Sequence, residues 1–281
     1  MDADILPFVL RDALTVAVGV ATGVLSGMFG VGGAVLSTPG IRVLGASPVI
    51  AIGSTIPSIL PSAAVGTVSY TKEKLVDWDV ALWAGVVGLL FSVGGALLTP
   101  VIPGGGHLQQ VATAALLTFS AWRLLRAGDS PALGDVPEAR PAGGLPAREA
   151  GAPKAWPRPL VISLTGAGAG LVSGILGIGG GTVMVPAFTE ILGLNLKRAV
   201  ATSLVCVGML AVPGGITHWA LGNIDWRFAL WLTIGVIPGA RIGSHITIGS
   251  HERTVRRLFG GFLLLLGLCY GVAELVAAFT D

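Results

Sequence analysis

Residues 170–186 read GLVSGILGIGGGTVMVP, and residues 23–39 read GVLSGMFGVGGAVLSTP. Seven positions are identical at a spacing of 147 residues, and most of the others exchange one aliphatic residue for another. The identical pairs are Gly23 and Gly170, Ser26 and Ser173, Gly27 and Gly174, Gly30 and Gly177, Gly32 and Gly179, Gly33 and Gly180, and Pro39 and Pro186. A match of this kind indicates an internal repeat, which decides the fold before any single element does.

The flanking sequence repeats as well. AIGST at residues 51–55 matches AVATS at residues 199–203, and Asp-Trp occurs at residues 77–78 and again at residues 225–226. We therefore predict two tandem membrane repeats, residues 1–126 and 159–281. Residues 127–158 between them are rich in proline and mixed charges, a composition typical of a flexible linker.

The composition excludes a soluble protein. The chain has 281 residues, of which 53% are hydrophobic and 11% charged, whereas soluble domains carry about 25% charged residues. The net charge of +2 gives no indication of nucleic-acid binding. Cys206 and Cys269 lie in separate apolar runs, so neither a disulfide framework nor a metal site is expected.

Apolar stretches predict an all-α polytopic membrane protein with about eight segments. The segments are residues 13–39, 48–70, 80–98, 108–125, 160–192, 199–221, 228–248 and 258–279. The first and the fifth are too long for a simple span, because about 27 helical residues reach about 40 Å across about 30 Å of hydrocarbon. Each has a glycine cluster in its middle, which predicts a re-entrant hairpin or a discontinuous helix.

The basic residues favour inverted repeats. If every segment crosses once, Lys and Arg divide almost evenly between the two sides of the membrane. If each glycine segment instead leaves the membrane on the side from which it entered, most basic residues lie on one face of the membrane and few on the other. The basic face then has Lys72, Lys74, Arg123, Arg126, Arg158, Lys197, Arg198, Arg253, Arg256 and Arg257, and the other has Arg11, Arg42 and Arg227. The positive-inside rule then places the linker in the cytoplasm and both termini outside.

Broken helices in inverted repeats expose helix N-termini near the membrane midplane, where backbone N–H groups attract anions. The candidate ligand-lining residues are Gly30, Gly32, Gly33, Gly177, Gly179, Gly180 and Gly181, with hydroxyl groups from Ser26, Ser173, Ser54, Thr55, Thr202 and Ser203. The alternative is that these small residues only allow close helix packing.

Ionisable residues within apolar segments are further candidates. Arg241 suits an oxyanion through paired hydrogen bonds, although it is near enough to a segment end to extend to the interface instead. Glu190, His218 and His245 are candidates for proton relay or charge balance, with interfacial placement as the alternative.

Two enzyme motifs are rejected. Gly177 to Gly181 have Thr182 where a dinucleotide fingerprint requires its third glycine, and no strand precedes them. A serine precedes a glycine in each cluster, but a hydrolase needs one nucleophile with a positioned base, not a duplicated serine.

The repeated S-G-(I/M)-(L/F)-G-(I/V)-G-G element, with A-(I/V)-x-(S/T)-(S/T) and D-W after it in each half, resembles the sulfite exporter TauE/SafE family. The resemblance covers residues 13–125 and 160–279. It implies a bacterial inner-membrane permease for sulfite, organosulfonates or similar sulfur oxyanions, and it extends to the glycine and Ser/Thr positions but not to Arg241.

We therefore expect secondary transport of a small sulfur-containing oxyanion, without enzyme activity, cofactor or metal. A passive anion channel and a non-transporting membrane subunit remain as alternatives. No Walker A motif indicates ATP drive, and coupling to a proton or an ion stays open. The expected partners are the small anion and the lipid bilayer.

Overall fold

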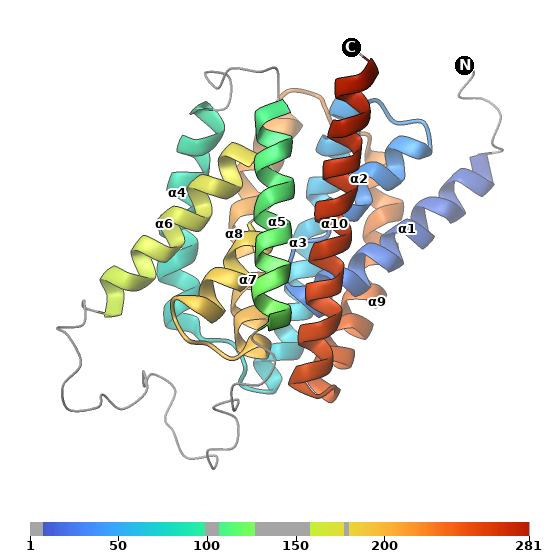
Figure 1. Ribbon diagram of the computed structural model, residues 1–281. Helices are drawn as coiled ribbons and strands as arrows, with labels where there is room; N and C mark the ends of the chain where they lie inside the picture. Colours follow the sequence, from blue (N-terminus) through green and yellow to red (C-terminus); the bar gives the residue numbers. More distant parts are fainter. Residues whose placement is uncertain (1–7, 99–106, 127–157, 177–179, 281) are drawn as a thin grey trace, which may run out of the picture.

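The computed structural model describes residues 8–98, 107–126, 158–176 and 180–280, which form ten α-helices and no strand (Figure 1). The helices are α1 (Phe8–Phe29), α2 (Ala34–Val43), α3 (Pro48–Lys72), α4 (Trp78–Leu98), α5 (His107–Arg126), α6 (Arg158–Leu176), α7 (Gly181–Glu190), α8 (Leu196–Ala220), α9 (Trp226–Gly249) and α10 (Glu252–Thr280). The predicted linker lies outside the described residues, except for Arg158.

The number of helices differs from the predicted eight segments because the two long segments are each divided. Segment 13–39 forms α1 and α2, and segment 160–192 forms α6 and α7. Within the described residues, six helices are long and apolar enough to cross a membrane, namely α1, α3, α4, α6, α8 and α10. The fold is therefore all-helical, as predicted, but the segments do not correspond one to one with spans.

Side-chain caps at matching positions set the starts of the long helices. Ser47 accepts a hydrogen bond from the Ile50 N–H at the start of α3, and Asn195 accepts one from the Arg198 N–H at the start of α8. The Asp77 carboxylate accepts from the Val80 N–H in α4. Such caps satisfy N–H groups that have no partner within a helix.

Helix α1 and helix α2 form a hairpin that begins and ends at the same end of the bundle. Near the start of α1, Asp12 forms an ion pair with Arg227, the second residue of α9. Near the end of α2, Ile41 packs in a cluster with Phe228, which also lies in the first turn of α9. Both arms of the hairpin therefore end beside the start of α9.

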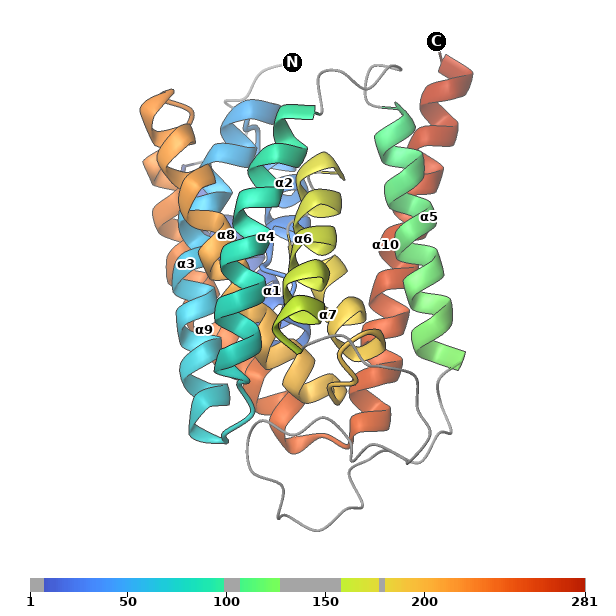
Figure 2. The same cartoon turned by 90° about the vertical axis from the view of Figure 1, so that its left-hand side faces the viewer.

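Helices α6 and α7 begin and end at the opposite end. Arg158 at the start of α6 forms an ion pair with Asp77, and Glu190 at the end of α7 forms one with Arg123 near the end of α5. Figures 1 and 2 show that the start of α1 and the end of α10 lie at one end of the bundle, and the end of α5 and the start of α6 at the other. The helices α3 and α8, which match in sequence, consequently run in opposite directions.

Each half contributes a long helix that packs along a helix of the other half. Helix α1 packs along α9, and α6 packs along α4. Glycines every four residues form these contacts: Gly19, Gly23 and Gly27 lie against α9, and Gly166, Gly170 and Gly174 lie against α4. Small residues at this spacing let helix backbones approach closely within a membrane.

Helices α5 and α10 pack mainly on each other and form one side of the bundle (Figure 2). Helix α10 joins the largest hydrophobic cluster through Phe259 and Phe262, whose rings stack on Phe29 at the end of α1. The core therefore lies where the first hairpin turns, which is also where the glycine clusters are.

Candidate functional site

The two glycine segments meet inside the bundle. Gly181 is the first residue of α7, and a Cβ atom at this position would overlap the carbonyl oxygen of Gly30 and the Cα of Val31. The backbone of the second hairpin thus rests directly on the turn of the first. Gly177 and Gly179 lie outside the described residues, so the contact is described from Gly180 and Gly181.

The first turn, residues 30–33 between α1 and α2, requires glycine at three of its positions. Gly30, Gly32 and Gly33 have φ values of 68°, 83° and 70°, in the left-handed region that side chains with a Cβ rarely adopt. The Ser203 hydroxyl lies 3.2 Å from the Gly30 carbonyl oxygen and 3.0 Å from that of Val200, and donates to them. Ser203 of the second half therefore fixes the turn of the first half.

Hydroxyl groups surround this turn. Ser62 of α3 donates a hydrogen bond of 2.9 Å to Ser26 of α1, and Tyr70 donates one of 2.6 Å to the Gly27 carbonyl oxygen. The Ser37 hydroxyl donates to the Gly33 carbonyl oxygen over 3.1 Å. All four side chains are fully buried. Hydroxyl groups therefore lie beside both ends of the first turn, while Val31 within it belongs to the largest hydrophobic cluster.

Thr22 completes this group and differs from it in one respect. Its side chain is 2% exposed, and its Oγ1 makes no hydrogen bond within the described structure. Thr22, Ser62 and Tyr70 were not predicted as site residues. The signal for Thr22 is its position four residues before Ser26, which places both on one face of α1.

Ser54 and Thr202 have matched partners away from the glycine turns. The Ser54 hydroxyl accepts a hydrogen bond of 2.8 Å from the Asp225 N–H, and the Thr202 hydroxyl accepts one of 3.1 Å from the Asp77 N–H. Each Asp-Trp corner is therefore attached to a helix of the other half. The Ser54 and Thr202 hydroxyls therefore connect the two halves of the protein.

We expect Ser54→Ala to lower the free energy of unfolding by about 1–3 kcal/mol, because the partly buried Asp225 N–H loses its acceptor. Anion affinity should stay within twofold of the wild type. The matched control is Ser69→Ala in the same helix, whose hydroxyl only returns a bond to the Val65 carbonyl oxygen. Chemical unfolding in detergent measures both variants, and equal stabilities would contradict the assignment.

The remaining predicted hydroxyls differ in whether they form hydrogen bonds at the first turn. Thr55 donates to the Ala51 carbonyl oxygen over 2.8 Å and receives a long hydrogen bond of 3.4 Å from Thr38 of α2. Ser173 is 5% exposed in α6 and occupies the position that Ser26 has in α1. Only Ser26 and Ser203, of the predicted Ser/Thr set, form hydrogen bonds at or beside the first turn.

The ionisable candidates lie away from the first turn. Arg241 is exposed on the outer face of α9, and its carbonyl oxygen lies 2.9 Å from the Nδ1 of the exposed His245. Glu190 forms its ion pair with Arg123 at the end of the bundle. His218 has a buried Nδ1 without a hydrogen bond in the described structure, beside Gly53. The structure brings none of these four described side chains to Gly30.

Two hollows lie at the Asp-Trp corners. One, of about 400 Å³, is lined by polar residues at the basic end: Thr71, Lys74, Asp77, Asp79 and Arg198, with Val76 and Trp78. The other, of about 210 Å³, is apolar and includes Trp219 and Trp226. The described residues contain no cluster of His, Cys, Asp or Glu with the makings of a metal site.

Residues 15–270 match the model of the family described as sulfite exporter TauE/SafE. The chain is 26% identical to the probable membrane transporter protein YunE of Bacillus subtilis over 90% of this chain and 95% of that protein. It is 26% identical to YjnA of the same organism over 90% of this chain and 97% of that protein, which has the same description. The chain is also 22% identical to the probable membrane transporter protein YfcA of Escherichia coli, over 80% of this chain and 77% of that protein.

No solved structure shows a significant match to the chain. The relatives are described as membrane transporters, and six described helices can span a bilayer. The protein is accordingly a multi-pass bacterial membrane protein. Because the family model covers most of its length, the chain belongs to the sulfite exporter TauE/SafE family.

Proposed function

We propose that the protein is a secondary transporter of a small sulfur-containing oxyanion, such as sulfite or an organosulfonate, and that it is not an enzyme. The observation that supports this most directly is the meeting of two glycine hairpins from opposite ends of the bundle. A broken helix inside a membrane is tolerated where protein buries it or where it lines a water-filled cavity, and in transporters its N-terminus attracts anions.

The proposed topology is an inverted repeat of residues 1–126 and 159–281. The first hairpin enters from the end that holds the start of α1 and the end of α10, and the second enters from the end where α5 finishes and α6 begins (Figure 1). Most basic residues lie near helix ends on this second side, so the positive-inside rule makes it cytoplasmic. The membrane is then the inner membrane, with residues 127–158 in the cytoplasm.

Alternating access is favoured over a passive channel. Gly30, Gly32 and Gly33 are all buried, and Gly181 closes on Gly30. A continuous pore would leave such a turn exposed to water. A closed turn suits a carrier that opens to one side at a time, because the ligand is enclosed between two packed hairpins.

The test is counterflow of sulfite in proteoliposomes that contain the full chain. We expect saturable uptake of labelled sulfite that unlabelled sulfite on the opposite side accelerates, because a carrier returns faster when loaded. Linear uptake with electrical conductance and no acceleration would indicate a channel. A panel of sulfite, sulfate, thiosulfate and methanesulfonate that neither moves nor raises the melting temperature of the purified protein would refute the transport of a sulfur anion.

A further inference from the structure

The residues around the two glycine clusters differ in chemistry although the clusters themselves match in sequence. Around the first turn, the side chains are hydroxyls at five positions where the second half has apolar or thiol groups. Thr22, Ser37, Thr38, Ser58 and Ser62 correspond to Ala169, Met184, Val185, Cys206 and Leu210. The first half therefore has more hydroxyls near its glycines than the second, in which Ser173 and Thr182 are buried hydroxyls.

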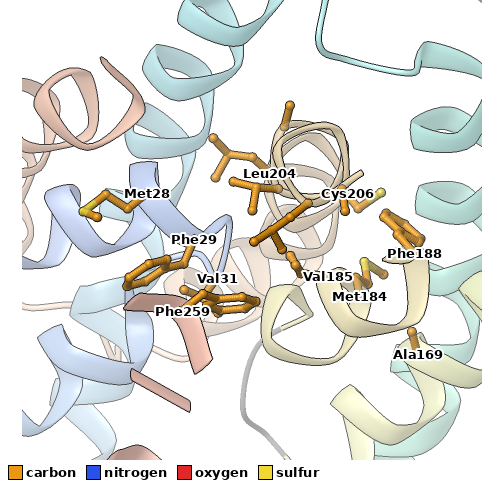
Figure 3. Close-up of a cluster of buried hydrophobic side chains, with 14 of the residues drawn as sticks. Met28, Phe29, Val31, Ala169, Met184, Val185, Phe188, Leu204, Cys206 and Phe259 are labelled. Atoms are coloured by element: carbon orange, nitrogen blue, oxygen red, sulfur yellow. The ribbon is translucent and has the colours of Figure 1, made fainter. Parts of the chain in front are cut away.

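Helix α7, which follows the second glycine cluster, is embedded in the hydrophobic core. Met184, Val185 and Phe188 of α7 are fully buried, and Figure 3 shows them beside Cys206 of α8. Within a membrane, such side chains stabilise a helix through van der Waals packing against their neighbours. By contrast, α2 buries only Ser37 and Ile41 fully. Helix α7 is thus held firmly by apolar contacts, and α2 is held less firmly.

Thr22 points to a ligand at the first turn. In a helix, a threonine hydroxyl usually bonds to the carbonyl four residues earlier, as Thr15 and Thr165 do here. Thr22 does not, although it is 2% exposed. Its side chain lies against Gly33, because a Cβ on Gly33 would be 2.6 Å from the Thr22 Cγ2. A buried hydroxyl left without a partner is costly unless a ligand uses it.

Gly33 is the N-cap of α2, a helix of ten residues, so Thr22 lies at the positive end of this helix. In the described structure, the N–H groups of Val31, Gly32 and Gly33 form no hydrogen bond. The turn with free amides therefore lies beside the Thr22 side chain of α1, whose hydroxyl is unused. Both are donors, which is the combination that an oxyanion requires.

We infer that the anion is bound by the first turn alone, through the amides at the start of α2 and the hydroxyls of Thr22 and Ser26. This inference rests on the proposed function. The start of α7 then acts as the packed surface against which the first turn closes. Because the site residues are buried, α2 must move away from α1 to admit the anion, which its smaller buried area permits.

The donors of this site are all uncharged. Helices α1 and α2, which supply the proposed donors, have only Arg11 and Arg42 as cationic residues, and each lies at the helix end remote from the turn. The cost of removing an ion from water rises steeply with its charge, and uncharged donors offset only part of that cost. The ligand class is therefore a singly charged sulfur oxyanion, such as hydrogensulfite or an alkyl sulfonate.

The test compares the duplicated serines by titrating methanesulfonate into the purified full chain. Ser26→Ala should weaken binding about tenfold or more, because a hydrogen bond to an ion is lost. Ser173→Ala should stay within twofold of the wild type. Equal losses in the two variants, or a larger loss in Ser173→Ala, would overturn the inference while leaving transport intact.

Thr22→Val provides a second measurement that does not depend on Ser26. The substitution keeps the shape and removes a hydroxyl without a partner, so the ligand-free protein should melt at the same or a higher temperature. Methanesulfonate affinity should nevertheless fall about tenfold. Unchanged affinity in Thr22→Val would overturn the assignment. If the wild type binds neither methanesulfonate nor sulfite, the proposed function itself fails.

Discussion

Gly30→Ala is expected to abolish transport and to destabilise the protein by several kcal/mol. Gly30 has a φ of 68°, and a Cβ at this position would overlap Ser203 Oγ and lie 2.6 Å from the Val200 carbonyl oxygen. The left-handed conformation costs an alanine about 1–2 kcal/mol. Displacement of packed backbone typically adds about 1–3 kcal/mol. The melting temperature in detergent and sulfite flux in liposomes measure the two effects.

Gly193→Ala is the control that separates the cost of the left-handed backbone from the cost of the collision. Gly193 has a similar φ of 65°, but no atom lies within 4 Å of the position of its Cβ. This control therefore carries the backbone cost without the collision, and we expect a small loss of stability with transport retained. If Gly30→Ala and Gly193→Ala lose equal stability, the contact between Ser203 and the first turn has no energetic role.

The sequence predicted the interruption of the first long segment because three glycines within four residues cannot continue a helix cheaply. The structure ends α1 at Phe29 and starts α2 at Ala34, on either side of those glycines. The matching starts of α3 and α8 also follow from local chemistry, since Ser47 and Asn195 are both helix caps. Local rules therefore predicted where helices begin and end.

Local rules did not predict the contacts between the two halves. That Ser54 holds the Asp225 N–H depends on how two distant helices pack, and no local pattern contains this information. The outward position of Arg241 is different, because a pattern did exist. Gly239 and Gly243 pack against α1, and a residue midway between them, at about 100° per residue, faces the opposite way.

Gly170→Ala is expected to destabilise the contact between α6 and α4 strongly. A Cβ at this position would overlap the carbonyl oxygen of Gly88 in α4, and the Gly88 Cα lies only 2.7 Å from it. Relief requires the two helices to separate along a contact that runs most of their length. We expect a loss of about 1–3 kcal/mol or more, as for other overpacked sites, measured by chemical unfolding in mixed micelles.

Gly168→Ala, two residues earlier in the same helix, is the matched control. No atom lies within 4 Å of the position of its Cβ, and the residue is exposed. Alanine is the better helix former by about 0.5–1 kcal/mol, so this variant should equal or exceed the wild type in stability. A loss of stability in Gly170→Ala with a gain in Gly168→Ala would show that the backbone contact between α6 and α4 decides stability here. A loss of stability in Gly168→Ala as large as that in Gly170→Ala would instead mean that α6 resists a methyl group on any face, and the close approach to α4 would explain nothing.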